Sequence, residues 1–391
     1  MPHRKPVTLE MIEANKKIYD EYFEASRNAD FVEQLMTPID RLYFRSRFIG
    51  FDETPERNNP DHPLIYISNH SGMAFPWDAI VFVSMFFKRN KFDFSKSVRA
   101  LTAPMLSKST LMNPFLVENF WKRGGGIDAS FLNFNTMMFY QHSNLLVYPE
   151  GVPGIGKPFS KRYQLQRFAT SFVRMAIKYE TDVIPFATVN GEYVNPYNLK
   201  SDFVNKIAQK LGIPFIPLGL MTLLIPLQPW MFYFGFPAKL TYVMGKRIKP
   251  YEMIDKPYEK ITDEEFQQIA DRIKAQLQTE LNAAVEKYGK KPYQVKELFS
   301  RWRKNKRKFP YFIPSFWPSL FAEFDRLSRK GRVKEMKVDV FSGLRAFRRH
   351  PVNIAFFVPI LGWIPILVKG YRKRSDSSHE AHKRYRKEKE V

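Results

Sequence analysis

The stretch 68–80, SNHSGMAFPWDAI, holds one histidine and one aspartate, His70 and Asp78. The apolar run 63–68 predicts that Asn69 and His70 follow a buried strand, at the end where α/β sheets bind ligands. A neutral histidine there can accept a proton from a hydroxyl, and a carboxylate that fixes its tautomer makes it a better base. The residues alone leave a plainer interpretation open, in which Asp78 caps the next helix and His70 is a hydrogen-bonded loop residue.

A second predicted strand end opens the segment 147–168, VYPEGVPGIGKPFSKRYQLQRF. A turn there holds Glu150 and Gly151, and the loop that follows is rich in glycine. It carries four cations, Lys157, Lys161, Arg162 and Arg167. Such a loop suits an anionic group, although the spacing of a P-loop is absent. A solvated basic loop without a ligand is the alternative.

Together these segments resemble the glycerolipid acyltransferases, the family of lysophosphatidic acid and glycerol-3-phosphate acyltransferases. The resemblance covers residues 45–290. It rests on three motifs that occur in the family's order: Asn69-His70…Asp78, Tyr148-Pro149-Glu150-Gly151 and Val183-Ile184-Pro185-Phe186.

The resemblance implies transfer of a fatty acyl group from a thioester to a hydroxyl of a glycerolipid. His70 would be the general base and Asp78 its orienting carboxylate, with no acyl-enzyme. Asn69, Glu150 and Gly151 would bind the acceptor. The sequence does not assign the oxyanion donors, and the backbone N–H groups near 124–126 are one candidate. The donor would be acyl-CoA or an acyl-carrier protein, and no further cofactor is expected.

Three departures from the family pattern concern the acceptor. The spacer between His70 and Asp78 has seven residues where four are usual, which is similar to a branch with diacylglycerol-type acyltransferases. Alanine 129 and proline 153 stand where the family has arginines that would hold a phosphate. Either the acceptor is neutral, or the lost arginines are replaced by Lys157, Lys161, Arg162 or Arg167.

The composition favours an acidic partner, because 62 Lys and Arg face 39 Asp and Glu, a net charge of +23. The absence of cysteine excludes disulfides and a thiol nucleophile. We expect no metal site, since only His379 and His382 are spaced as a helical ligand pair. A nucleic-acid-binding protein would explain the charge but not the Pro-Glu-Gly motif, so we expect no nucleic-acid partner. A catalytically silent lipid-binding or tethering protein on the same fold is the other alternative.

The pattern of elements predicts an α/β fold with a mostly parallel central sheet flanked by helices. Strands are expected over 42–51, 63–68, 97–103, 144–151, 182–191 and 239–248. Helices are expected over 8–35, 79–87, 131–141 and 162–178, and after a capping box at Thr262 and Glu265. We predict an N-terminal helical segment over 1–45, an acyltransferase domain over 46–290 and a helical, basic C-terminal appendage over 291–391.

Membrane lipids are the expected partners. Two uncharged stretches, 213–238 and 352–368, are broken by prolines and would make poor spanning helices. Either could be packed in a core or lie in a bilayer interface. The basic run 301–308 and the basic residues after 368 suit an anionic surface. The charged N-terminus has no apolar signal region. We therefore expect a peripheral or monotopic protein on the cytoplasmic face, docked through 291–391; the sequence does not predict its oligomeric state.

Overall fold

The computed structural model describes residues 7–70, 75–108, 113–199, 201, 206, 218–339, 341–349 and 351–370. Within them the strands form one sheet in the order β1-β7-β6-β2-β5-β3-β4. Every neighbouring pair is parallel except β6 and β7, which are antiparallel. The predicted α/β fold with a mostly parallel sheet is confirmed. The strands are β1 (Arg47–Ile49), β2 (Ile65–Ser68), β3 (Val98–Thr102), β4 (Ile127–Asp128), β5 (Asn144–Val147), β6 (Val183–Val189) and β7 (Thr241–Met244).

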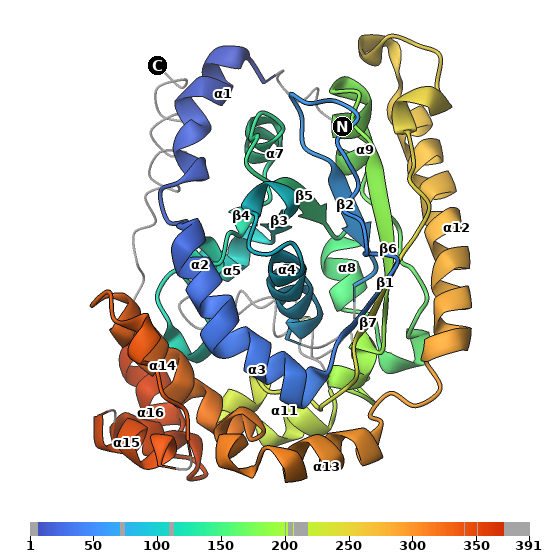
Figure 1. The fold of residues 1–391 in the computed structure, drawn as a ribbon. Helices are drawn as coiled ribbons and strands as arrows, with labels where there is room; N and C mark the ends of the chain where they lie inside the picture. Colours follow the sequence, from blue (N-terminus) through green and yellow to red (C-terminus); the bar gives the residue numbers. More distant parts are fainter. Residues whose placement is uncertain are drawn as a thin grey trace.

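The central strands are buried on both faces, because a hydrophobic layer covers each side of the sheet. Alternate residues of β2 point to opposite layers: Ile65 and Ile67 join one core, and Tyr66 joins the other. Helix α12 (Asp263–Tyr288) covers the first face with α9 (Ser171–Lys178) and α7 (Phe131–Met137). Helix α4 (Trp77–Arg89) lies on the second face, which the N-terminal helices also cover (Figure 1).

Helix α12 follows the sequence prediction closely. The Thr262 side chain accepts from the backbone N–H of Glu265, and the Glu265 carboxylate accepts from the backbone N–H of Thr262, so the predicted capping box is present. The apolar stripe from Phe266 to Leu281 is buried against the sheet. The remaining short elements of the central region are η4 (Phe94–Lys96), α5 (Pro104–Lys108), η6 (Pro114–Leu116), α6 (Phe120–Arg123), α8 (Gly151–Ile155), η7 (Phe159–Lys161), η8 (Gly191–Val194), α11 (Leu220–Leu224), η9 (Pro229–Phe232), η10 (Pro250–Met253) and η11 (Tyr258–Lys260).

The N-terminal segment differs from the single helix predicted over 8–35. It consists of α1 (Leu9–Asn15), η1 (Lys16–Tyr19), α2 (Ala25–Phe31), η2 (Val32–Met36), α3 (Thr37–Ile39) and η3 (Asp40–Phe44). The helical path therefore continues to residue 44, where a strand was predicted. The Asp40 carboxylate accepts hydrogen bonds from the backbone and the hydroxyl of Ser46, and Arg45 is left-handed at φ 51°. This turn ends the helix and leaves β1 only three residues long.

The C-terminal region is packed into the body of the protein. The indole of Trp317 is fully buried and lies edge-on against Trp77 and Tyr43 at 5.0 Å between ring centroids. Residues from Tyr311 to Ile366 share the larger core with α4 and β2. The predicted helical C-terminal region is confirmed, and its boundary at 291 stays a prediction. The region consists of α13 (Val295–Lys304), η12 (Lys306–Tyr311), η13 (Pro314–Phe316), α14 (Trp317–Ser328), η14 (Val333–Glu335), α15 (Ser342–Arg349), η15 (Pro351–Phe356), α16 (Trp363–Pro365) and η16 (Ile366–Gly370).

Candidate active site

His70 is held at the carboxyl end of β2 by its neighbour, Asn69. The Asn69 amide donates to the carbonyl of Thr188 at 2.9 Å, and its oxygen accepts from the Thr188 N–H at 2.7 Å. The side chain thus continues the pairing between β2 and β6 for one more residue, and it is fully buried. Both polar ends of the Asn69 side chain thus bind the backbone of Thr188, which positions His70. The predicted contact of Asn69 with the acceptor stays a prediction.

Glu150 fixes the backbone of His70 directly. Its Oε1 accepts from the His70 N–H at 2.8 Å, and its Oε2 accepts from the Gln166 N–H at 2.6 Å. The carboxylate is buried, so burial raises its pKa, while the charge of Lys157 acts in the opposite direction. Glu150 therefore ties two loops together behind His70, and both of its oxygens are engaged without a substrate.

Lys157 turns inward toward two carboxylates. Its Nζ lies 3.8 Å from Oε2 of Glu150 and 3.4 Å from Oε1 of Glu192. The three side chains are 1%, 0% and 3% exposed, respectively. Charges that have left water are tolerated when they are paired, so these three residues stabilise one another. We call them the buried charge cluster: Glu150, Lys157 and Glu192.

The other predicted cations lie on the surface. Lys161, Arg162 and Arg167 are exposed. Arg162 places its guanidinium over the ring of Phe159, and Arg167 donates two hydrogen bonds to Gln267 of α12. Of the four cations in this loop, the structure thus brings only Lys157 into contact with the residues that hold His70.

The ring of His70 stacks on Tyr148, with 4.5 Å between centroids and 24° between planes. Its Nδ1 is buried and has no hydrogen-bond partner among the residues that the structure describes. Burial, and after it the positive charge of Lys157, lowers the pKa of His70 to about 3. The imidazole is therefore neutral at physiological pH, which is the form that can accept a proton.

Asp78 lies in the first turn of α4 and is buried. Its backbone carbonyl accepts from the hydroxyl of Tyr242 at 2.7 Å. Burial, together with the charge of Asp78, raises the pKa of Tyr148 well above its usual value. The described contacts of His70 run to Glu150 and Tyr148, so its orientation by Asp78 remains a prediction. Residues 71–74, which connect the two, lie outside the described part of the chain.

Two glycines shape the loop beside His70. Gly151 begins α8 with φ +56°, a conformation that other residues adopt at a cost, and it faces open space. A Cβ on Gly154 would lie 2.4 Å from Cβ of Glu150 and 3.1 Å from Cβ of His70. Helix α8 can therefore approach the histidine only because position 154 has no side chain.

The glycines at 124–126, one candidate for the oxyanion donors, have their N–H groups engaged in hydrogen bonds. Their three N–H groups donate within their own turn, to the carbonyls of Phe120, Lys122 and Trp121 at 2.8–3.0 Å. Gly125 instead lies against Phe23 and Arg99.

Several residues that complete the site have weak sequence signals. Tyr148 precedes the Pro-Glu-Gly motif, and Gly154 lies in its glycine-rich loop. Thr188 lies near the end of β6, the strand of the third motif, and Glu192 follows that strand. The packing of β2 beside β6 brings Thr188 to Asn69 and Glu192 to Lys157.

The region just described coincides with a match to a known family. Residues 51–189 match the family model described as Acyltransferase. Residues 51–189 belong to the acyltransferase family. This segment contains His70, Asp78, Glu150 and β6, so the resemblance that the three motifs indicated is confirmed for it.

Curated proteins to which this chain is similar are described as uncharacterized proteins. One from Mycobacterium tuberculosis is 24% identical over 262 residues, which is 66% of this chain and 68% of the relative. One from Mycobacterium leprae is 24% identical over 254 residues, 63% of this chain and 64% of the relative. Among solved structures, the 1-acyl-sn-glycerophosphate (LPA) acyltransferase PlsC from Thermotoga maritima aligns with a TM-score of 0.35 and 14% identity, over 63% of this chain and 80% of that chain.

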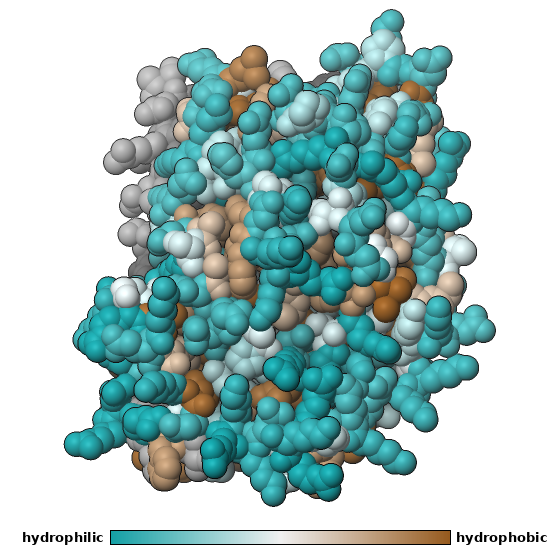
Figure 2. Space-filling view, viewed as in Figure 1, coloured by the Kyte–Doolittle hydropathy of each residue, from teal (hydrophilic) through white to brown (hydrophobic). Residues whose placement is uncertain are grey.

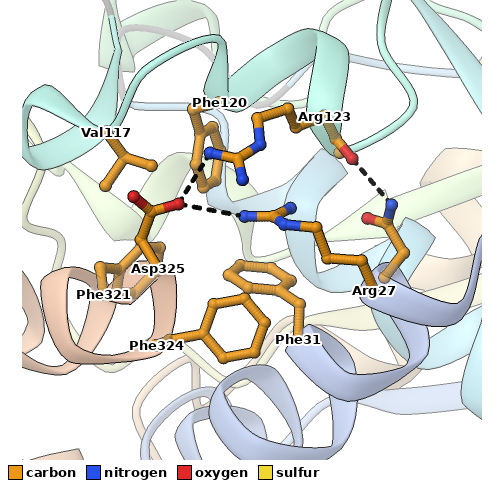
Figure 3. Close-up of a pocket in the computed structure, with 10 residues that line it drawn as sticks. Arg27, Phe31, Val117, Phe120, Arg123, Phe321, Phe324 and Asp325 are labelled. Carbon is orange, nitrogen blue, oxygen red and sulfur yellow. Dashed lines mark hydrogen bonds and ion pairs between the residues drawn. The ribbon is translucent and has the colours of Figure 1, made fainter. Parts of the chain in front are cut away.

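A small hollow lies elsewhere, between α2, α6 and α14 (Figure 3). Its floor holds Asp325, which pairs with Arg123 at 2.7 Å and Arg27 at 3.5 Å, and the rings of Phe31, Phe120, Phe321 and Phe324 surround the pair. Both arginines pair with this carboxylate, so we interpret the hollow as the site of an interhelical ion pair and not as the reaction site. The described residues contain no cluster of three potential metal ligands.

Proposed function

We propose that the protein transfers a fatty acyl group from an acyl thioester to a hydroxyl of a glycerolipid. The observation that carries the proposal is the placement of His70: a neutral imidazole at a strand end, inside the acyltransferase-family segment, with its backbone fixed by the Glu150 carboxylate. Acyl-CoA or an acyl-carrier protein is the proposed donor, because the chain has no cysteine that could carry the acyl group.

The proposed step is a direct displacement. A ring nitrogen of His70 accepts the proton of the acceptor hydroxyl while the hydroxyl oxygen attacks the thioester carbonyl. The carbon–sulfur bond then breaks, an ester forms, and the leaving thiolate takes the proton from the imidazolium. An imidazolium beside Lys157 in a buried site is costly, so a carboxylate close to the ring would favour the step. Asp78 is the candidate, and Asp78→Asn should reduce kcat by orders of magnitude while the protein remains folded.

The acceptor is proposed to bind at the glycine-rich loop. Lys157 is held by glutamates, and Arg167 is bound to Gln267. The exposed Lys161 and Arg162 are the cations of this loop left to meet a phosphate. A phosphorylated acceptor predicts that Lys161→Ala or Arg162→Ala raises KM by about tenfold, because a charge-assisted hydrogen bond contributes about 1.5–3 kcal/mol. A neutral acceptor predicts an unchanged KM in both variants.

The direct test is acyl transfer by the purified full chain with acyl-CoA and, separately, with an acyl-carrier protein as the donor. The acceptors are glycerol-3-phosphate, lysophosphatidic acid, other lysophospholipids and diacylglycerol, and products are identified by lipid mass spectrometry. Transfer to at least one of these acceptors supports the proposal. Binding of lipid without transfer, to any acceptor and from either donor, would instead favour the silent lipid-binding protein.

A further inference from the structure

The two uncharged stretches of the sequence meet in the fold. The N–H of Ile360 donates to the carbonyl of Leu227 at 2.6 Å, and the indole of Trp363 donates to the carbonyl of Pro226 at 2.8 Å. The rings of Trp230 and Phe356 also lie edge to face, 4.3 Å apart. Segments more than a hundred residues apart in the chain therefore form one continuous piece of structure.

This piece exposes aliphatic side chains on both segments. Leu223 is 71% exposed and Ile360 is 64% exposed. We call the whole set the apolar surface: Leu220, Leu223, Leu224, Leu227, Val352, Ile354, Phe357, Val358, Ile360, Leu361, Ile364, Leu367 and Val368. Contiguous exposed apolar area of this kind marks an interaction site in a soluble domain. In Figure 2 a few tan and brown side chains lie among teal ones at the lower left, where Figure 1 places α15 and α16.

Cations border the apolar surface. Phe357 lies against Phe316, which in turn lies against Phe309 of η12, with ring centroids 4.8 Å and 5.2 Å apart. The basic residues of η12, Lys306, Arg307 and Lys308, are exposed beside this chain of rings. Helix α15 packs on η15 and ends with exposed Arg348 and Arg349, of which Arg349 pairs with Glu323.

From this arrangement we infer that the apolar surface, with its bordering cations, docks on an anionic lipid bilayer and lies in its interface. Apolar burial and attraction to anionic lipid act together in such attachment, and each is marginal alone. No helix in the described part of the chain is long and apolar enough to span a membrane. Docking would therefore come from side chains on short, proline-broken helices.

Other occupants fit less well. A second copy of this chain would bring two sets of bordering cations together across an apolar contact, and each chain carries a net charge of +23. The 21 residues that follow Gly370 include only Tyr371, Ala381, Tyr385 and Val391 as hydrophobic side chains, so they offer little to cover the surface.

The apolar surface also connects to the candidate active site. Helix α11 packs on η9, and the carbonyl of Tyr233, which follows η9, accepts from the indole of Trp77 at 2.8 Å. Trp77 immediately precedes Asp78. A bilayer on this surface would thus lie beside the segment that packs on the start of α4, which suits the delivery of a lipid acceptor. This last link rests on the proposed function, whereas docking itself does not.

The test is flotation of the full chain with vesicles of phosphatidylcholine, with and without phosphatidylglycerol. Leu223→Gln is compared with Leu9→Gln, because Leu9 is 69% exposed on α1, far from α11 in Figure 1. Leu223→Gln should lower the partition coefficient about tenfold, since a leucine side chain leaves the lipid, and Leu9→Gln should leave it unchanged. A combined variant should lose flotation at high salt, where the cations are screened. It carries Leu223→Gln, Leu227→Gln, Ile364→Gln and Leu367→Gln. Circular dichroism and thermal unfolding confirm that each variant is folded.

Two results would overturn the inference. In one, the combined variant floats as the wild type does, or Leu9→Gln and Leu223→Gln lower the partition coefficient by the same factor. In the other, light scattering shows a wild-type dimer that the combined variant dissociates, which assigns the surface to a second copy. Failure of the proposed function looks different: the wild type floats and the variant does not, but neither transfers an acyl group to acceptor in vesicles or in detergent.

Discussion

Most proteins bury apolar side chains and expose charged ones. The loop beside His70 departs from this rule by burying charges, and the apolar surface departs from it by exposing apolar side chains. At the loop, two carboxylates and an ammonium group are buried around Lys157. At the apolar surface, leucine and isoleucine side chains remain in water. Burying a charge and exposing apolar area both cost stability. The buried charge cluster therefore depends on contacts inside the protein. The apolar surface makes few contacts, so it should contribute little to stability until a partner covers it.

Removal of the ammonium group should have the largest effect on stability. Lys157→Met leaves Glu150 and Glu192 buried without a counter-charge, so the free energy of unfolding should fall by about 3–5 kcal/mol. Lys161→Met is the matched control on the same loop. It removes an exposed charge, and its free energy of unfolding should stay within about 0.5 kcal/mol of the wild type in urea denaturation. Equal losses in the free energy of unfolding of the two variants would show that the buried charge cluster does not stabilise the loop.

The next effect concerns pH and His70. Its folded pKa, about 3, lies below the unfolded value of 6.5. Between these values the unfolded chain binds more protons, so stability is present at neutral pH and is lost as the pH falls. The slope from this one group is about 1.4 kcal/mol per pH unit, or about 2 kcal/mol at pH 5. His70→Gln should remove this part of the slope, as measured by denaturation at a series of pH values. An identical slope in the variant would mean that the imidazole is solvated.

Gly154 tests the close approach of α8. Gly154→Ala places a methyl group 2.4 Å from Cβ of Glu150, so either the loop or His70 must move. We expect a loss of about 1–3 kcal/mol in stability and a lower kcat. Gly331→Ala is the control, because a Cβ there meets no atom within 4 Å. Its strain at φ +65° should cost about 1 kcal/mol and leave the rate of transfer unchanged.

The smallest effect is expected at the apolar surface. Leu223→Gln should change the free energy of unfolding by less than about 0.5 kcal/mol, because the side chain has few partners to lose. By contrast, Leu277→Ala in the buried stripe of α12 should cost about 2–5 kcal/mol. Were Leu223→Gln as costly as Leu277→Ala, residues 220–227 would be core and not surface.

The strand ends that carry His70 and Glu150 could be predicted because apolar runs of four to six residues lead into them. The inward turn of Lys157 could not, since the position of Glu192 depends on the packing of β2 beside β6. The hydrogen bonds of Asn69 could not be predicted for the same reason: their partner, Thr188, is distant in the sequence. The buried face of α14 could have been predicted from the sequence. Trp317, Leu320, Phe321, Phe324 and Leu327 recur at helical spacing, which indicates a buried face.

The central claim is that His70 is the general base of an acyl transfer. It is tested most directly by comparing the wild type and His70→Ala with acyl-CoA and the acceptor that the panel identifies, at equal concentrations of folded protein. The account predicts product from the wild type and none above background from His70→Ala, with Leu9→Gln folded and able to form product. Transfer by His70→Ala at a rate near that of the wild type would contradict it.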